Sequence, residues 1–244
     1  MTDFLSRLTH APRRFTPVSD AREDIDAFID SRTLEYPGRL EDAFAERARN
    51  LGVESGMVLD VGTRVGLIAL KILWQNENFF SIGVDASKEM VDRARETATA
   101  WGLNERAFFQ VGDARRMRLK SNYFDLAVSD CVLHSFDDPI SVLCEIGRVL
   151  KPSGALLIRD FRRPNRFRMS RGVDDLSRRH GARMRRQIES SLRAACTLTQ
   201  LREIVRQSKL ERANIVEFDE HYIGVERRGT TDPNSWVSMR EQDR

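Results

Sequence analysis

The stretch MVLDVGTRVGLIAL, residues 57–70, decides the fold of this 244-residue chain. A short apolar strand, MVLDV, leads into a turn that contains glycine and then into an apolar helix. Gly62 and Gly66 let the backbone approach a ligand closely, and the helix that follows presents unpaired N–H groups and a partial positive charge. Such a turn suits a carboxylate or a phosphate equally well, so the turn alone does not identify its ligand.

The alternation of strand and helix continues beyond this stretch. We expect strands in FFSIGVD, AFFQVGD, YFDLAVSD and ALLIRDF, and helices in SKEMVDRARETATAWG and DDPISVLCEIGRVLKPSG. Ser87 is the expected N-cap of the first helix and Asp137 or Asp138 that of the second, which Pro152 and Gly154 are expected to end. Continuous apolar strands between helices predict an α/β fold with a parallel sheet covered on both faces.

We expect the residues before the first strand to form an N-terminal arm. Residues 1–56 contain prolines and charges, with a short helix expected near Asp24–Asp30 and a second helix in GRLEDAFAERARNLGV. Residues 57–161 then form the expected ligand-binding core of what we take to be one domain.

The segments after the core are of three kinds. Residues 162–195 form an insert with 11 arginines, too long for an ordinary loop, which we expect to be half helical and to act as a lid. Residues 196–228 predict a helix that starts with a capping box from Thr197 to Gln200, and a β-hairpin around Asp219–Glu220. Residues 229–244 are polar and predict a frayed tail.

Composition excludes several classes of protein. Hydrophobic residues make up 41% of the chain and charged residues 32%, with a net charge of +3, which is typical of a soluble globular protein. No stretch approaches the roughly 20 apolar residues of a membrane span, and the N-terminus lacks an apolar run of signal-peptide length. Cys131, Cys144 and Cys196 are too few and too widely spaced for a disulfide framework or a zinc site. We therefore expect a cytoplasmic protein with no membrane partner.

Acidic residues stand at the ends of three expected strands. Asp60 belongs to D-x-G, Asp85 follows 25 residues later, and Asp113 belongs to G-D-A. The carboxyl ends of parallel strands meet at one edge, which is where open α/β sheets bind ligands. Asp85 can accept hydrogen bonds from both hydroxyls of a ribose, and Asp113 can accept one from an adenine amino group. Together they predict a nucleoside site.

With these motifs the chain resembles the class I, Rossmann-like S-adenosylmethionine-dependent methyltransferases, closest to the small-molecule ubiquinone/menaquinone branch. Asp60, Gly62 and Gly66 match the family's D-x-G-x-G-x-G motif, from which Arg64 departs, and Asp85 and Asp113-Ala114 match its second and third motifs. YFDLAVSDCVLHSFDDPISVLCEIGRVLKPSG resembles the fourth strand and following helix over its whole length, although the family usually has a paired His where this chain has His134-Ser135. The resemblance covers roughly residues 38–161, with a weaker match to about residue 226.

The resemblance implies a mostly parallel seven-stranded sheet with helices on both faces, S-adenosylmethionine as cofactor, and in-line methyl transfer to a small molecule. The implied cofactor-binding residues are Arg39, Asp60, Gly62, Thr63, Arg64, Gly66, Asp85, Ala86, Asp113, Ala114 and Ser129. For Arg39, which would meet the cofactor carboxylate, a solvated arginine is the competing interpretation. The dehydrogenase fingerprint G-x-G-x-x-G does not fit the spacing of Gly62, Arg64 and Gly66.

Arg64 leaves two interpretations open. In the first, position 64 needs a positive φ, arginine costs roughly 1–2 kcal/mol of backbone strain there, and the cofactor site is weakened or a relic. In the second, the turn is slightly reshaped, and Arg64 points away or donates to the methionine carboxylate of the cofactor. The presence of both Asp85 and Asp113 favours a site that binds.

His134 and Asp160 are the candidate catalytic residues. A sulfonium methyl group is already activated, so the enzyme mainly aligns donor and acceptor, and a base is needed only if the acceptor must lose a proton. His134 is a candidate for substrate contact or for the base, or else a capping histidine. Asp160 faces the cleft, or else pairs with Arg162 or Arg163. Cys131 lacks the further cysteines of arsenite methyltransferases and reads as a buried apolar residue.

The arginines of the insert bear on the partner. His180, Arg183, Arg185 and Arg186 would suit an anionic small-molecule substrate, a subunit contact in a homodimer, or an exposed helix. The alternatives to a small-molecule methyltransferase are an RNA methyltransferase that uses this segment, which has Phe167 as its one aromatic residue, and a non-catalytic relic. We expect no metal and no nucleic-acid partner.

Overall fold

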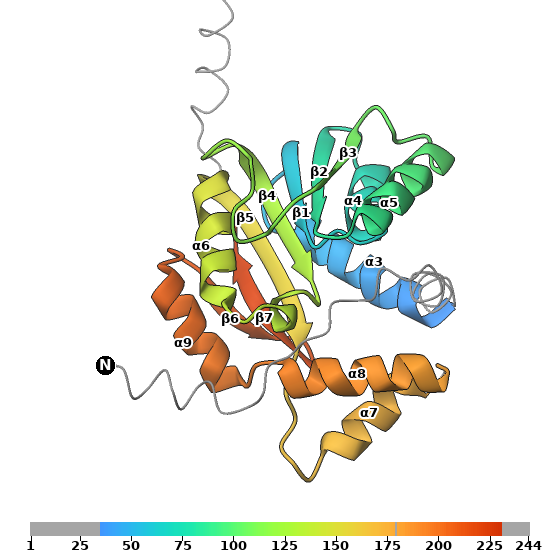
Figure 1. Cartoon of the computed structure of the whole chain (residues 1–244). Coiled ribbons are helices and arrows are strands. Elements are labelled where there is room, and N and C mark those ends of the chain that lie inside the picture. The colour runs from blue at the N-terminus through green and yellow to red at the C-terminus, as the bar shows by residue number, and fades with distance from the viewer. Residues whose placement is uncertain (1–34, 179, 231–244) are drawn as a thin grey trace, which may run out of the picture.

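A mixed sheet with helices on both faces forms the body of the molecule, and a two-helix insert lies at one edge (Figure 1). The computed structural model describes residues 35–178 and 180–230. The helix expected near Asp24–Asp30 and the tail from residue 231 lie outside the described residues.

The sheet has seven strands in the order β3-β2-β1-β4-β5-β7-β6. The first five in the chain are parallel to one another, whereas β7 runs antiparallel to both β5 and β6. This arrangement confirms the predicted fold class, including the hairpin around Asp219–Glu220. The strands are β1 Gly56–Val61, β2 Phe79–Asp85, β3 Ala107–Val111, β4 Phe124–Asp130, β5 Leu150–Phe161, β6 Asn214–Glu217 and β7 Tyr222–Arg227.

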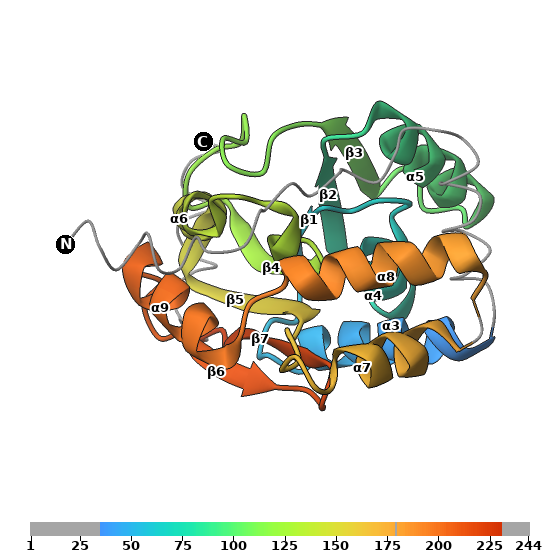
Figure 2. The ribbon, with the colours of Figure 1, turned by 60° about the horizontal axis from the view of Figure 1, so that its bottom comes forward.

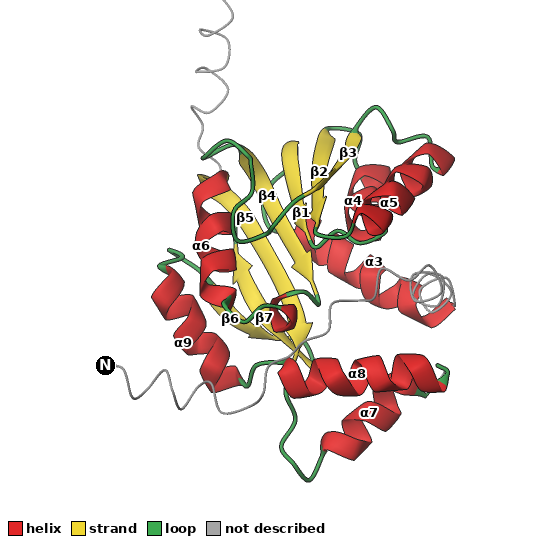
Figure 3. Ribbon diagram, viewed as in Figure 1, coloured by secondary structure: helices red, strands yellow, loops and turns green. Residues whose placement is uncertain are grey.

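The helices divide between the two faces and one edge of the sheet, as Figure 3 shows. Helices α3 (Glu35–Arg49), α4 (Leu67–Gln75) and α5 (Lys88–Ala100) cover one face, with a core that includes Phe44, Leu70, Phe79 and Val91. Helices α6 (Pro139–Val149) and α9 (Leu198–Ser208) cover the other face. The short 3-10 helix η1 (Leu133–Ser135) and helices α7 (Met169–Ser177) and α8 (Ala182–Ala194) lie at the carboxyl edge of the parallel strands.

Side-chain caps begin the helices where the sequence predicts them. The Ser87 hydroxyl accepts a hydrogen bond from the Met90 N–H at the start of α5, and the Asp138 carboxylate accepts one from the Ser141 N–H at the start of α6. At α9 the capping box is complete, because Thr197 and Gln200 each accept from the other's backbone N–H. These caps set the residue at which each of the three helices begins.

The end of α6 differs from the expectation. The helix ends at Val149 rather than at Pro152 and Gly154, and β5 begins at once with Leu150. Leu150 pairs with Phe124, and the register then shifts so that Leu126 pairs with Ala155. The proline and glycine therefore occupy an irregularity within β5 instead of a loop before it.

The hairpin strand β7 packs against β5 through a glycine. A Cβ atom on Gly224 would lie 1.8 Å from the Ile158 carbonyl oxygen and 2.8 Å from the Phe218 ring. Only glycine allows this approach, since the obstruction on the strand side is backbone. The hairpin thus closes the sheet beside the end of β5, which carries Asp160.

We expect Gly224→Ala to lower the free energy of unfolding by about 3 kcal/mol, because the added methyl group overpacks a site that cannot yield. Gly172→Ala is the matched control, since a Cβ there meets its nearest atoms at 3.7 Å inside a helix. The control should change stability by less than about 1 kcal/mol. Urea unfolding measures both, and equal effects of the two substitutions would contradict the packing argument.

Candidate functional site

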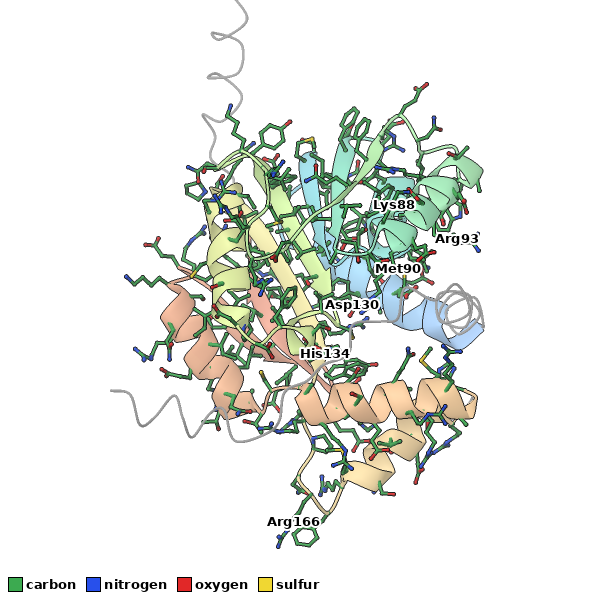
Figure 4. All side chains as sticks on the ribbon, viewed as in Figure 1. Lys88, Met90, Arg93, Asp130, His134 and Arg166 are labelled. Carbon is green, nitrogen blue, oxygen red and sulfur yellow. The ribbon has the colours of Figure 1, made fainter. Side chains whose placement is uncertain are left out.

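The carboxyl ends of β2, β1 and β4 lie side by side, and helix α8 crosses in front of this edge (Figure 2). Asp130 and His134 both stand at this edge, between the sheet and α8 (Figure 4). The site is therefore built from strand ends on one side and from the insert on the other.

The turn between β1 and α4 is held to the neighbouring strand. The N–H groups of Gly62 and Thr63 donate to the Val84 carbonyl oxygen at 2.8 and 3.1 Å. A Cβ on Gly62 would lie 2.3 Å from the side chain of Val132, so a larger residue would push the β1 and β4 ends apart. Gly66 precedes α4 with φ 82° and offers no side-chain cap of its own, and the Asp60 carboxylate accepts a hydrogen bond from the Ala69 N–H in the first turn of the helix.

Asp60 is buried beneath this turn rather than presented to the cleft. Its side chain accepts a hydrogen bond from the Thr63 hydroxyl at 2.7 Å, and the two residues are 2% and 5% exposed. Burial raises the pKa of Asp60 from 3.8 to about 7, although the Thr63 hydrogen bond opposes the rise. Asp60 thus shapes the turn from below.

Asp85 closes the other side of the turn. One carboxylate oxygen accepts from the Arg64 N–H at 2.9 Å and the other from the Ser87 N–H at 2.9 Å. A carboxylate has about four acceptor sites, so two remain for other donors. The neighbouring Ala86 is exposed.

The remaining expected cofactor residues are engaged in different ways. Asp113 is 46% exposed at its side chain and makes a two-pronged ion pair with Arg115, whose hydrogen bonds lower the pKa of Asp113. Ala114 is buried. The Ser129 hydroxyl donates to the Val61 carbonyl oxygen at 3.0 Å and so ties β4 to β1. Arg39 lies in α3, and its side chain is outside the described part of the chain.

Arg64 adopts φ 51°, as the first interpretation of its position requires. Its guanidinium group does not point away from the site, because one nitrogen donates to the carbonyl oxygens of Asp130 and Cys131 at 2.7 and 2.6 Å. The side chain therefore spans from the β1 turn to the end of β4.

A buried ion pair fixes the end of β4. The Arg159 guanidinium donates to the Asp130 carboxylate at 2.8 and 3.0 Å, and both residues are 5% exposed. Burial alone lowers the pKa of Arg159, but the charge and hydrogen bonds of Asp130 outweigh this effect and raise it. The guanidinium carbon also lies 4.8 Å from the centre of the Phe44 ring and 5.2 Å from that of Tyr222. Sequence reasoning missed Arg159, although a cation inside the apolar strand ALLIRDF signals a buried partner.

His134 and Asp160 form a second buried pair beside the first. The His134 Nδ1 lies 2.6 Å from one Asp160 oxygen, and the His134 backbone N–H donates to the other at 2.7 Å. The imidazole packs edge-on against Phe161, with 5.3 Å between ring centres. Arg162 instead pairs with Glu217 and Arg163 with Gln200, so the structure brings the two predicted catalytic residues together.

Cys131 behaves as a buried residue without reactive character. Burial raises the pKa of its thiol well above 9.0, with Asp130 and Asp160 adding to the effect. A thiol held in this way stays protonated and is a poor nucleophile. The interpretation as an apolar core residue fits this environment.

The insert forms a helical hairpin with a small core of its own. Val173, Ile188 and Leu192 pack together, and Phe161 at the end of β5 joins them. Several of its arginines pair with its own acids: Arg185 with Asp174, Arg178 with Asp175, and Arg193 with Glu189. Helix α8 also contacts η1, so the insert covers the segment that carries His134.

The strand order, the antiparallel seventh strand and the glycine turn between acidic strand ends define the architecture of a class I methyltransferase. A model of the methyltransferase domain matches residues 53–228, and the chain belongs to this family. Membership confirms the class predicted from the sequence, and S-adenosylmethionine is the cofactor of that class. Within the described residues, no helix combines the length and the apolar character that crossing a membrane requires.

The chain is similar to several curated proteins over about half of its length and about half of theirs. It is 34% identical over 121 residues to an uncharacterized methyltransferase of Bacillus subtilis, which is 50% of this chain and 47% of that protein. It is 31% identical over 112 residues to a demethylmenaquinone methyltransferase of Bacteroides fragilis, 46% of each chain. To the ubiquinone/menaquinone biosynthesis C-methyltransferase of Desulfotalea psychrophila it is 32% identical over 106 residues, 43% and 42% of the two chains.

Solved structures share the fold. A SAM-dependent methyltransferase of Aquifex aeolicus aligns over 83% of this chain and 98% of its own with a TM-score of 0.63 and 21% identity. A putative S-adenosyl-L-methionine-dependent methyltransferase of Methanococcus maripaludis aligns over 89% and 98% with a TM-score of 0.67 and 18% identity. The phosphoethanolamine N-methyltransferase 2 of Haemonchus contortus, solved with S-adenosyl-L-methionine, aligns over 88% and 45% with a TM-score of 0.63 and 19% identity.

The burial of Asp60 predicts a pH dependence of stability. The folded chain holds this proton up to about pH 7, whereas the unfolded chain releases it near 3.8. Between these values the folded chain binds more protons, so the contribution of Asp60 to the free energy of unfolding falls as pH rises. We expect Asp60→Asn, which cannot ionise, to gain stability relative to the parent chain between about pH 4 and pH 7. Urea unfolding across this range tests it, and a constant difference between the two proteins would contradict the buried acid.

Proposed function

We propose that this protein transfers the methyl group of S-adenosylmethionine to a small-molecule acceptor that loses a proton to His134. The observation that carries the proposal is the joining of two sites at one edge of the sheet: the β1 turn with Asp85, and the buried pair of His134 and Asp160. A cofactor site alone would not need an imidazole oriented by a carboxylate.

The residues of the turn fit the cofactor. Asp85 has acceptor sites left for two ribose hydroxyls after binding two backbone N–H groups, and the partial positive charge at the N-terminus of α4 suits a carboxylate. The Asp113 carboxylate can accept a hydrogen bond from an adenine amino group only while it also binds Arg115. Asp60, Thr63 and Ser129 support the turn from within the core, while Gly62 and Gly66 keep it close to the ligand.

The bound cofactor supplies an activated methyl group. The protein positions the methyl donor and the acceptor, and it provides a group that accepts the proton. Asp160 accepts from both the backbone N–H and, in one tautomer, the Nδ1–H of His134, which directs the other ring nitrogen, Nε2, to act as the base. Helix α8 covers the segment that carries His134, which keeps water from the reacting atoms.

A small acceptor agrees with the charge distribution of the insert. Arg178, Arg185 and Arg193 pair with acids of the same insert, which lowers the positive charge available to the backbone of RNA. The similarity to a demethylmenaquinone methyltransferase supports a quinol-like acceptor. An anionic acceptor, a cytoplasmic location and a homodimer stay predictions.

Asp85→Ala should weaken the binding of S-adenosylhomocysteine by about tenfold or more, because the ribose loses its acceptor and the turn loses its anchor at Arg64. Asp92→Ala, an exposed aspartate on the adjacent helix α5, is the control and should bind like the parent chain. Isothermal titration measures both. An unchanged dissociation constant for Asp85→Ala would refute the assignment of the site, and no binding to the parent chain would refute the proposed function.

His134→Gln should slow methyl transfer by about 100-fold or more while the affinity for S-adenosylhomocysteine stays within a factor of about three. The acceptor is first sought by incubating the protein with methyl-labelled S-adenosylmethionine and a panel of phenols, quinols and hydroxy acids. His221→Gln, on the turn between β6 and β7, is the control and should transfer methyl groups at the parent rate. If His134→Gln does the same, His134 only caps the strand end.

A further inference from the structure

We propose that Arg64 is a latch: its guanidinium group occupies the methionine end of the cofactor site and must turn out before S-adenosylmethionine binds. The inference rests on the proposed function and adds to it a residue that sets cofactor affinity. It comes from the position in which this chain departs from the glycine pattern of its family.

The strand order determines the path of the cofactor. With the ribose at Asp85, on the end of β2, the rest of the molecule has to cross the β1 turn toward the end of β4, because β1 lies between these strands. Arg64 starts from the same turn and runs in the same direction. Its guanidinium ends on the carbonyl oxygens of Asp130 and Cys131, at 2.7 and 2.6 Å. The Arg64 side chain and the methionine end of the cofactor would therefore occupy the same space.

The two carbonyl oxygens are the kind of acceptor that a methionine ammonium group needs. A guanidinium and an ammonium are both cations that donate charge-assisted hydrogen bonds to carbonyl oxygens. The guanidinium of Arg64 thus imitates the charged end of the cofactor while the latch is closed. The buried pair of Asp130 and Arg159 holds these carbonyl groups in place in either state.

The backbone of Arg64 is fixed independently of its side chain. The N–H of Arg64 donates to Asp85 at 2.9 Å, and φ is 51°. The turn can therefore keep its shape while the half-buried side chain changes its rotamer. Opening breaks the two hydrogen bonds to the β4 end and leaves the backbone hydrogen bond from the Arg64 N–H to Asp85 in place.

A closed latch lowers apparent affinity by the fraction of molecules that are open. If the latch is closed in about 90–99% of molecules, the dissociation constant of any ligand that needs the space rises about 10- to 100-fold. A ligand that stops short of the β4 end binds with its intrinsic affinity. This difference separates a latch from a general weakening of the site.

Arg64→Ala removes the guanidinium but keeps a Cβ, so the cost of the positive φ is retained. We expect S-adenosylhomocysteine to bind this variant about tenfold more tightly than the parent chain. 5′-Methylthioadenosine, which has the nucleoside and the thioether but no amino-acid end, should bind both proteins equally. Isothermal titration of the two ligands against the two proteins gives the four constants. Arg64→Gly, which also relieves the strained φ, should give the same pattern and serves if the alanine variant does not fold.

Each other result overturns the latch. Equal affinity of S-adenosylhomocysteine for the variants and the parent chain would show that the guanidinium does not compete. Weaker binding to the variants would show that Arg64 grips the cofactor carboxylate instead, and the proposed function would stand. Tighter binding of both ligands would assign the gain to the turn itself. If neither ligand binds any of the proteins, the cofactor site and the latch both fail.

Discussion

The ion pair between Asp130 and Arg159 is the constraint on which the rest of the site depends. Two opposite charges that are each 5% exposed persist in the core only if they bind one another with good geometry, as the two hydrogen bonds do here. The pair locks the ends of β4 and β5 in register, and the Cys131 N–H completes the link by donating to the Arg159 carbonyl oxygen. The carbonyl groups that Arg64 meets, and the strand that carries Asp160, take their positions from it.

Two polar systems meet at this edge of the sheet, and they face opposite sides of β5. Arg159 points toward α3, where Phe44 and Tyr222 flank its guanidinium. Asp160, one residue later, points the other way, toward His134. Because successive side chains of a strand alternate between faces, one strand end supplies both an anchor for β4 and an orienting carboxylate for an imidazole.

Much of the fold could be predicted from the sequence, because the signals that specify it are local. Apolar runs, the caps at Ser87 and Asp138 and the capping box at Thr197 each depend on a few adjacent residues. The predicted end of α6 was wrong because Pro152 and Gly154 suit a bulge inside a strand as well as a loop. The pairing of Leu150 with Phe124 places them inside β5. The pairing of His134 with Asp160 depends on contacts across the sheet, which no local pattern encodes, and the apolar strand around Arg159 indicates burial without naming Asp130 as its partner. The reach of the Arg64 side chain is of the same kind, since its partners lie 66 and 67 residues away.

The insert leaves the sheet and returns to it at one point. Arg162 bridges to Cys196, and the Arg163 N–H donates to the Cys196 carbonyl oxygen at 2.9 Å, so the two ends of the helical hairpin are pinned together beside β5. A segment whose ends are fixed in this way, and which buries its own apolar residues, is close to a self-contained cassette. The insert and the sheet beneath it are thereby structurally separate parts of one chain, joined beside β5.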